Sequence, residues 1–224
     1  SFSMAQQDVR YFLNGMLLEV AAEHVRTVAT DGHRLAMCTV QPGADGASRQ
    51  VIVPRKGVLE LARLLADGDD PVSVSLGGNH LQAAVEGFRF TTKLVDGKFP
   101  DYEKVIPRGG HREVLADRQA LREAFQRTAI LSNEKYRGVR ILLGEDALTV
   151  QANNPEQEEA EEVVPVDFGG DPLEIGFNVS YLLDVLGVLE SEQVRVTVSD
   201  ANSSALLEDA TGGDCVYVVM PMRL

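Results

Sequence analysis

The run Val28-Ala29-Thr30-Asp31-Gly32-His33-Arg34-Leu35-Ala36 places an Asp-Gly pair between two stretches in which apolar and polar residues alternate. Because glycine readily adopts the positive φ of a primed turn, this run predicts a tight β-hairpin. The second unusual stretch is the end of the sequence, Val218-Val219-Met220-Pro221-Met222-Arg223-Leu224. It is so apolar that it must be buried or occupied for the protein to stay soluble.

The alternating pattern recurs along the chain and is interrupted by segments with helical spacing. Pro54 and Asn178 each follow an apolar strand pattern and open a helix, and they stand 124 residues apart (178 − 54). Val72 and Val194, which begin the following strands, stand 122 residues apart (194 − 72). A period this long is no solenoid unit and predicts two copies of one helix-and-sheet domain.

The same spacing rules predict the order of the elements. Strands are expected at residues 10–14, 16–20, 24–30, 34–40, 51–53, 72–76, 81–85, 88–94, 113–116, 139–143, 148–152, 161–166, 173–177, 194–198, 204–207 and 216–220. Three helices are expected. The first begins at Pro54, and its apolar side is Val58, Leu61, Ala62 and Leu65. The second follows a cap at Asp117 and has the apolar side Leu121, Ala124, Phe125 and Thr128, and the third spans residues 179–189. Residues 1–7 resemble a frayed helix end, 41–48 a loop and 96–110 a linker.

Composition places the chain among ordinary globular proteins. Its 224 residues predict one or two domains, and the apolar content of 44% and charged content of 25% are average. No apolar run is long enough to cross a membrane, and no signal peptide is visible, although a truncated start would hide one. Cys38 and Cys215 match no CxxC pattern, so we expect two reduced core residues of a cytosolic protein.

The net charge of −13 argues against nucleic-acid binding if the charge is evenly spread, because phosphate binders usually carry a basic patch. It is not evenly spread. The segment 156–162 holds five acidic residues, Glu156, Glu158, Glu159, Glu161 and Glu162. Taken alone, such a run indicates a solvated face.

Several motifs occur in an order that identifies a family. They are residues 10–15, 27–35, 93–102, 130–135, 153–159 and 220–224. Together they closely resemble the bacterial sliding clamp family, the beta subunit of DNA polymerase III, from residue 1 to residue 224. A full clamp subunit has three similar domains, and this chain is too short for three. We expect a middle domain over residues 1–106 that lacks its start, and the last domain over residues 107–224.

The resemblance implies an α+β DNA-clamp fold, in which repeated domains each pack two helices on antiparallel sheets. Helices line a central hole and sheets form the outer wall. The first copy here would be incomplete.

The resemblance also implies a peptide pocket between the middle and last domains, which takes partner tails containing Leu and Phe. The matching residues are Arg10, Leu13, Thr30, Gly32, His33, Arg34, Leu35, Pro100, Lys104, Val105, Asn178, Tyr181, Ser204, Val218, Val219, Met220, Pro221, Met222, Arg223 and Leu224. Methionines adapt to different tails, and arginines hold polar peptide atoms. Ordinary packing is the alternative for each. Lys104 stands where the family often has Arg and Asn202 where an apolar residue is common, which bears on the preferred peptide.

A second implied surface lies near duplex DNA. The residues are Gln7, Tyr11, Phe12, Arg55, Lys56, Arg63, Arg118, Arg122 and Arg127, of which the basic ones lie on or beside predicted helices. The alternative is a solvated helix face. No base-reading motif is present, so any contact would be to phosphate and independent of sequence. Because a closed ring retains DNA by encirclement, strong attraction is unnecessary.

The third implied surface closes a head-to-tail ring. It comprises Ile130, Leu131, Glu156, Glu158, Glu159 and Glu162, which in the family meet basic residues on the first domain of another subunit. A heterologous contact needs both surfaces. We therefore expect this chain to be a monomer at micromolar concentration, and light scattering would show a stable symmetric dimer if this expectation is wrong.

The motifs give no support for catalysis. The four histidines lack HExxH or other metal spacing, and there is no GxSxG elbow or Walker phosphate loop. We expect no cofactor, and a cytoplasmic, non-catalytic processivity factor that encircles double-stranded DNA and tethers polymerase subunits, clamp loader and repair proteins. The alternative is a DNA-independent cytosolic module whose groove takes another peptide or ligand.

Overall fold

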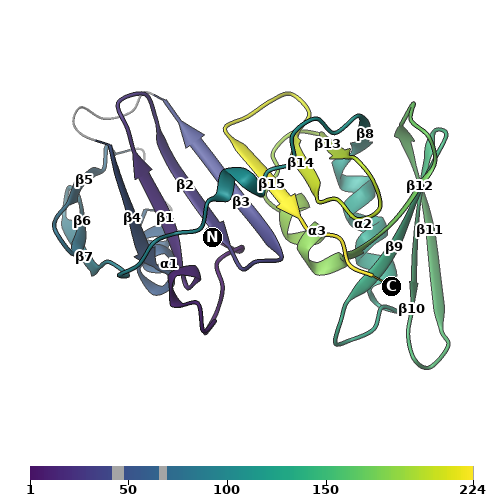
Figure 1. Ribbon diagram of the computed structural model, residues 1–224, viewed down its shortest axis with the longest axis horizontal. Helices are drawn as coiled ribbons and strands as arrows, with labels where there is room; N and C mark the ends of the chain where they lie inside the picture. The colour runs from purple at the N-terminus through teal and green to yellow at the C-terminus, as the bar shows by residue number, and fades with distance from the viewer. Residues whose placement is uncertain (42–47, 66–69, 224) are drawn as a thin grey trace. The chain divides into compact units, whose positions relative to one another are not determined.

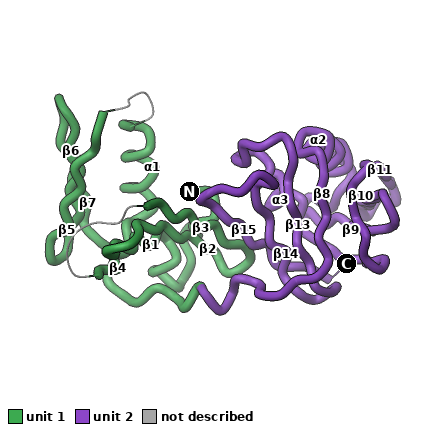
Figure 2. The backbone as a smooth tube through the Cα atoms, turned by 90° about the horizontal axis from the view of Figure 1, so that it is seen from above, with its two compact units in different colours: residues 1–102 green, residues 103–224 purple. Residues whose placement is uncertain are grey.

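The structure is a computed structural model that describes residues 1–41, 48–65 and 70–223. The chain forms two compact units, Ser1–Tyr102 and Glu103–Leu224 (Figure 2). The division falls inside the expected linker, most of which is irregular apart from the 3₁₀ turn η2 at Tyr102–Lys104. The described part of the expected loop at 41–48 is limited to its two end residues.

Unit 1 contains a four-stranded antiparallel arrangement in the order β4-β1-β2-β3 (Figure 1). The bounds are β1 Gly15–Val20, β2 Val25–Thr30, β3 Arg34–Val40 and β4 Arg49–Pro54. The register sets Leu17 opposite both Val28 and Ile52, and all three are at most 3% exposed. Alternation therefore puts one face of these strands into the core of the unit.

A second, three-stranded sheet and one helix complete unit 1. The sheet has the order β5-β6-β7, with bounds Ser73–Leu76, His80–Val85 and Phe88–Lys93, and the helix α1 spans Arg55–Leu64. Val58 and Leu61 of α1 pack on a buried cluster that contains Val53, Leu81 and Leu94. The helix begins after Pro54, as predicted, because a missing N–H costs nothing at a helix start.

Unit 2 contains antiparallel strands in the order β12-β9-β10-β11-β8-β13-β14-β15. Their bounds are β8 Arg112–Asp117, β9 Gly138–Gly144, β10 Ala147–Asn153, β11 Glu159–Asp167, β12 Leu173–Asn178, β13 Gln193–Val198, β14 Ala205–Asp209 and β15 Cys215–Val219. Helices α2, Arg118–Ala129, and α3, Val179–Leu186, lie against them (Figure 1).

The strands of unit 2 wrap around the two helices. A cavity of about 30 Å³ at the centre is lined by Leu121 and Phe125 of α2, Leu182 of α3, Ile141 of β9 and Leu207 of β14, among others. Strands from both ends of the order therefore share one core with both helices. The predicted apolar side of α2 is confirmed, since Leu121, Ala124, Phe125 and Thr128 are all buried.

Five local expectations are wrong. Residues 10–14 form no strand but a 3₁₀ turn, η1, at Tyr11–Leu13, because the side chain of Asn14 bonds both the N–H and the C=O of Asp8 and closes a loop. Residues 1–7 form turns, and Ala5 donates to the carbonyl of Leu13. Helix α3 ends at Leu186, short of the expected Leu189, although the N–H of Gly187 still donates to the carbonyl oxygen of Leu183.

The other two wrong expectations concern the burial of Ala62 and the state of the two cysteines. Ala62 is exposed, because α1 packs on the buried cluster through Val58 and Leu61 instead. Cys38 and Cys215 are half-buried and neither is a free thiol, a state that their separation in sequence gave no means to predict. Among the described residues, no helix is long and apolar enough to span a membrane.

Loss of the Asp117 cap will destabilise unit 2. The Asp117 carboxylate accepts a hydrogen bond of 2.7 Å from the backbone N–H of Ala120, which otherwise has no partner in the first turn of α2. Replacing it in Asp117→Ala is expected to cost about 1 kcal/mol, measured from the midpoint of urea unfolding. Asp117→Asn is the matched control, because asparagine also caps. Equal loss in both variants would show that the cap is not the cause.

Candidate functional site

The β2–β3 hairpin forms where the Asp-Gly signal predicts it, but its turn is longer than two residues. Strand β2 ends at Thr30, which pairs with Leu35, and β3 begins at Arg34, so residues 31–33 make the connection. Asp31 Oδ1 accepts from the backbone N–H groups of His33, at 2.9 Å, and Arg34, at 3.1 Å. Gly32 has φ of 89°, where an L side chain would be strained. Asp31 thus fixes the turn through its own side chain.

Arg10 lies across this turn. Its Nη2 is 2.8 Å from Asp8 Oδ2 and donates to the carbonyl oxygen of Asp31 at 3.3 Å. A Cβ atom on Gly32 would be 3.2 Å from the Arg10 guanidinium nitrogens, so glycine also leaves the space that the arginine occupies. The hydrogen bonds from Arg10 lower the pKa of Asp8 from its usual 3.8 to about 2.

Arg34 ties the turn to the first residues of the chain. Its Nε lies 3.1 Å from Asp31 Oδ2, its Nη2 donates to the carbonyl oxygen of Phe2 at 2.9 Å, and its guanidinium carbon lies 5.3 Å from the centre of the Phe2 ring. Unit 1 therefore brings Arg10, Gly32 and Arg34 of the predicted peptide set together. Leu13 and Leu35 are buried core residues at 2% and 1% exposure, and Pro100 is exposed.

In unit 2 the C-terminal segment lies beside strand β12. The backbone N–H of Met222 donates to the carbonyl oxygen of Gly176 at 2.9 Å. Met222 and Arg223 line one side of a hollow of about 440 Å³, which we call the tail hollow. Its other residues are Asn133, Tyr136, Gly138, Asn153, Asn154 and Pro155. Of the predicted peptide set, the structure places Met222 and Arg223 at this hollow.

Asn133 and Tyr136 stand on a tightly bonded loop after α2, whereas Asn153, Asn154 and Pro155 lie at the end of β10 and in the turn that follows it. Asn133 Oδ1 accepts from the backbone N–H groups of Lys135 and Tyr136, both at 3.0 Å. Arg137 has φ of 52° and donates to the carbonyl oxygen of Ala129 at 3.0 Å. Tyr136 is held with 56% of its surface exposed. An exposed tyrosine between loop residues was the one sequence signal that could have pointed to this site.

The remaining members of the predicted peptide set differ in exposure. Val218 and Val219 are buried at 1% and 0%, whereas Met220 is 39% exposed. Asn178 caps α3 by accepting from the N–H of Ser180 at 2.9 Å. Lys104 and Asn202 are exposed, and Val105, Tyr181, Ser204 and Pro221 are half-buried. Leu224 lies outside the described residues.

Several members of the predicted DNA set already have partners within the protein. Arg63 pairs with Glu60 at 2.6 Å, Arg127 with Glu162 at 2.7 Å, and Arg118 donates to the backbone carbonyls of Ser191 and Leu186. The others vary in exposure: Gln7, Tyr11 and Lys56 are exposed, and Phe12, Arg55 and Arg122 are half-buried. Pairing reduces the positive charge that these helix faces offer to phosphate.

The predicted ring set lies on unit 2. Ile130, at the end of α2, is 77% exposed, an unusual state for a large aliphatic side chain beside a core helix. The Arg127–Glu162 pair joins α2 to β11, and Glu158 accepts from the Asn154 side chain at 2.7 Å. Glu156 and Glu159 are exposed and Leu131 is half-buried. These residues combine an exposed apolar spot with acidic charge.

A polar cluster in unit 1 was not predicted. Glu19 is 9% exposed, and its carboxylate contacts His24 at 2.7 Å, Arg26 at 3.5 Å and the side chains of Gln50 and Tyr102. Burial opposes ionisation of Glu19, but the hydrogen bonds from His24 and Gln50 outweigh it and hold its pKa below its usual value. The cluster satisfies a buried acid and is structural. Among the described residues, no group of acidic, His and Cys side chains could hold a metal ion.

The fold and these surfaces define a class: a protein of two similar units in which α1 of unit 1, and α2 and α3 of unit 2, pack on antiparallel sheet, with a hollow beside the C-terminal segment. The chain belongs to the DNA polymerase III beta subunit family. The model of the family's central domain matches residues 1–101, and the model of its C-terminal domain matches residues 103–223.

Similar proteins and solved structures agree with this family assignment. The beta sliding clamps of Pseudomonas putida and Escherichia coli strain K12 are 65% and 56% identical to the whole of this chain. A crystal structure of the Pseudomonas aeruginosa DNA polymerase sliding clamp with ligand matches at 65% identity with a TM-score of 0.97, and one of the Caulobacter crescentus clamp, titled C. crescentus beta sliding clamp, at 35% with a TM-score of 0.95. The chain spans 61% of the length of these relatives.

The Asp8–Arg10 pair gives a pH dependence with a definite direction. A carboxyl whose pKa is lowered by folding stabilises the native state fully above its unfolded pKa, and this contribution is lost as the pH falls through the folded pKa. For Asp8 that window runs from its usual 3.8 down to about 2. NMR titration of the Asp8 carboxyl should give a midpoint near the lower value, and Arg10→Gln should raise it towards the usual one. An unchanged midpoint in the variant would contradict this assignment.

Proposed function

We propose that the protein to which this chain belongs is a sliding clamp, a non-catalytic processivity factor of the bacterial replicative DNA polymerase. As a head-to-tail ring it encircles duplex DNA, and short peptides of polymerases, clamp loader and repair proteins bind to it. The observation that carries the proposal is the tail hollow, a cavity of about 440 Å³ against the C-terminal segment of a clamp-family chain. We propose residues 1–106 as the central domain and 107–224 as the last, in a cytoplasmic protein.

Two similar proteins have been crystallised with a bound molecule, which is consistent with a ligand site on proteins of this family. One crystal structure is titled as a Pseudomonas aeruginosa sliding clamp bound to griselimycin, and another as a Caulobacter crescentus clamp with PEG bound to a putative beta-motif tethering region. Here the hollow presents an exposed tyrosine, a methionine and an arginine, which suit an apolar side chain flanked by polar peptide atoms. Burying one Leu and one Phe contributes roughly 3 to 6 kcal/mol before ordering costs, which favours micromolar binding.

The arginines on the β2–β3 turn suit the polar part of a peptide. Arg10 is half-exposed, with 50% of its side-chain surface accessible, and Arg34 is held by Asp31 and Phe2. A guanidinium fixed in this way loses little entropy when it donates to peptide carbonyls. We assign Arg10, Thr30, Gly32, His33 and Arg34 to peptide binding on this basis.

The residues of the predicted DNA set would lie beside the enclosed duplex and would make only weak contacts with its phosphates. Lys56 and Arg122 have no ion pair among the described residues, whereas Arg63 and Arg127 are neutralised by glutamates. With a net charge of −13, this chain has little long-range attraction for phosphate. A ring that encloses the duplex does not need it. For ring closure, the exposed Ile130 and the acidic residues around Glu158 would meet an apolar and basic surface of another subunit.

The peptide site is tested by titrating a labelled Gln-Leu-x-Leu-Phe peptide and following fluorescence anisotropy. Tyr136→Ala and Met220→Ala are each expected to weaken binding by about tenfold or more, because truncated aromatic and apolar anchors dominate such interfaces. Val74→Ala is the control, since Val74 is also an exposed apolar residue, at 49%, and lies on β5 of unit 1. Circular dichroism confirms that the variants fold.

The outcomes separate the two functional classes. Micromolar binding that both substitutions weaken supports the clamp. No binding of the clamp-type peptide to the folded wild-type chain would favour a DNA-independent module with another ligand. Unchanged affinity in Tyr136→Ala would remove the tail hollow from the site.

A further inference from the structure

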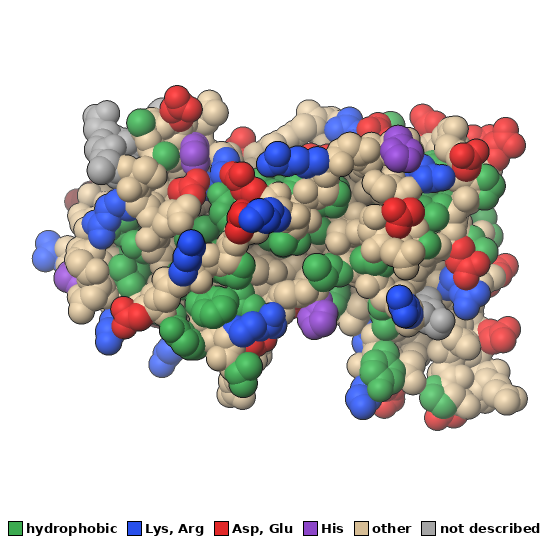
Figure 3. Space-filling view, viewed as in Figure 1, with side chains coloured by type: hydrophobic (Ala, Val, Ile, Leu, Met, Phe, Trp, Pro, Cys, Tyr) green, Lys and Arg blue, Asp and Glu red, His purple; other side chains and the backbone are tan. Residues whose placement is uncertain are grey.

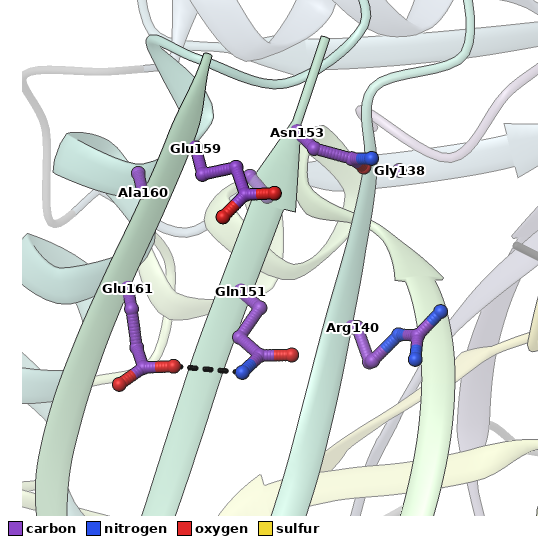
Figure 4. A pocket seen from close by; sticks show the side chains of 8 residues that line it. Gly138, Arg140, Gln151, Asn153, Glu159, Ala160 and Glu161 are labelled. Carbon is purple, nitrogen blue, oxygen red and sulfur yellow. Dashed lines mark hydrogen bonds between the residues drawn. The ribbon is translucent and has the colours of Figure 1, made fainter. Parts of the chain in front are cut away.

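A second hollow lies on the outer face of strands β9, β10 and β11, and we call it the strand hollow. Its volume is about 640 Å³, and it is lined by Gly138, Arg140, Gln151, Ala152, Asn153, Glu159, Ala160 and Glu161 (Figure 4). Figure 4 shows the side chains of Arg140, Gln151 and Glu159 projecting over the same side of the three strands. None of the surfaces described above accounts for it.

Strand register explains why these side chains share a face. Gln151 stands opposite Arg140 on one side and Glu161 on the other, and Asn153 stands opposite Glu159. The alternate residues Val139, Ile141 and Val150 are buried, and Ile141 lines the small central cavity with Leu121 and Phe125 of α2. The polar row therefore faces away from the core. Gly138 and Asn153 line the end of the strand hollow.

The strand hollow carries unbalanced negative charge. Arg140 is neutralised by Glu174, whose carboxylate lies 2.9 Å from the Arg140 Nη1 atom. Glu161 accepts a hydrogen bond from the neutral Gln151 side chain at 2.7 Å, and Glu159 is fully available. Within the described residues, neither Glu159 nor Glu161 has a cationic partner. Acidic side chains also gather over this end of unit 2 in Figure 3. Any occupant with complementary charge is basic.

The strand hollow continues into the tail hollow. Gly138 and Asn153 line both, and Met222 and Arg223 stand on the far side of the tail hollow. A peptide segment that extends from the tail hollow past Asn153 would therefore reach the strand hollow, which Gln151 and Glu161 line. A strand rises about 3.3 Å per residue, so two or three residues of an extended segment would span that step.

We propose that the strand hollow binds basic residues that flank the peptide motif of a partner protein, with Glu161 as the acidic contact. The inference rests on the proposed peptide-binding function and adds to it the charge of the flanking segment. Glu159 also belongs to the predicted ring set, whereas Glu161 belongs to no other surface. Glu161 is therefore the residue to test.

The experiment compares peptides on the same protein. A core Gln-Leu-x-Leu-Phe peptide is titrated beside versions that carry two lysines before or after the motif. One lysine-extended peptide is expected to bind about threefold more tightly than the core at low salt, the size of effect given by exposed ion pairs, and the advantage should fade as salt rises. Glu161→Gln should abolish the advantage and leave affinity for the core peptide unchanged.

Controls separate the local contact from overall charge. Glu145→Gln removes an equal charge from the exposed β9–β10 turn, outside both hollows, and should keep the advantage. Glu161→Lys should reverse the preference, so that a peptide extended with two glutamates becomes the tighter binder. This reversal requires a folded protein and cannot arise from loss of structure.

The proposal fails if neither lysine extension helps, or if Glu145→Gln lowers the advantage as much as Glu161→Gln does. Those results would leave core-peptide binding intact and the proposed function standing. Absence of core-peptide binding would instead overturn the proposed function itself.

Discussion

The structure of unit 2 depends on a division between the two faces of its strands. Ile141, Leu143, Leu148 and Phe177 point to one side, where they line a small cavity together with Phe125 and Leu182 of the helices, and all are 6% exposed or less. Burial of such side chains contributes about 25 cal/mol per Å² of apolar surface, the largest favourable term available to the fold. The register of these strands is therefore fixed, because a shift by one residue would turn the entire apolar set towards water.

The same division creates the surfaces on which function is proposed. Fixing the inward set also fixes the outward row of Arg140, Gln151 and Glu161 across β9, β10 and β11. The C-terminal segment bonds to β12 through Gly176, which brings Met222 to the open end of this row beside Gly138 and Asn153. The hollows are thus consequences of sheet register and of where the C-terminal segment lies on β12.

In unit 1 the β2–β3 turn is ordered differently, by charged side chains that form hydrogen bonds with backbone groups. Asp31 accepts from the N–H groups of its own turn while Arg34 and Arg10 hold the surrounding segments. Exposed ion pairs contribute little to global stability. Their effect here is positional, since each arginine has more than one partner and so a restricted orientation. A prearranged guanidinium binds a ligand with less loss of entropy than a free one.

Sequence alone determined the antiparallel strands, the helix starts at Pro54, Asp117 and Asn178, and the family. These follow from local spacing and cap chemistry, which act within a few residues of chain. It missed the η1 turn, because the bonds between Asp8 and Asn14 that form it leave no periodic trace. It also placed a primed turn where Asp31 holds a longer one.

The tertiary structure alone decided which distant residues meet. Tyr136, Asn153 and Met222 are far apart in sequence, and only the pairing of β9 with β10 and of the tail with Gly176 brings them to one hollow. It also decided that Arg127 of α2 pairs with Glu162 of β11, since these residues lie 35 positions apart in sequence and meet only because α2 packs on β11. Periodicity records which face of an element is buried, but it carries no information on what lies opposite that face.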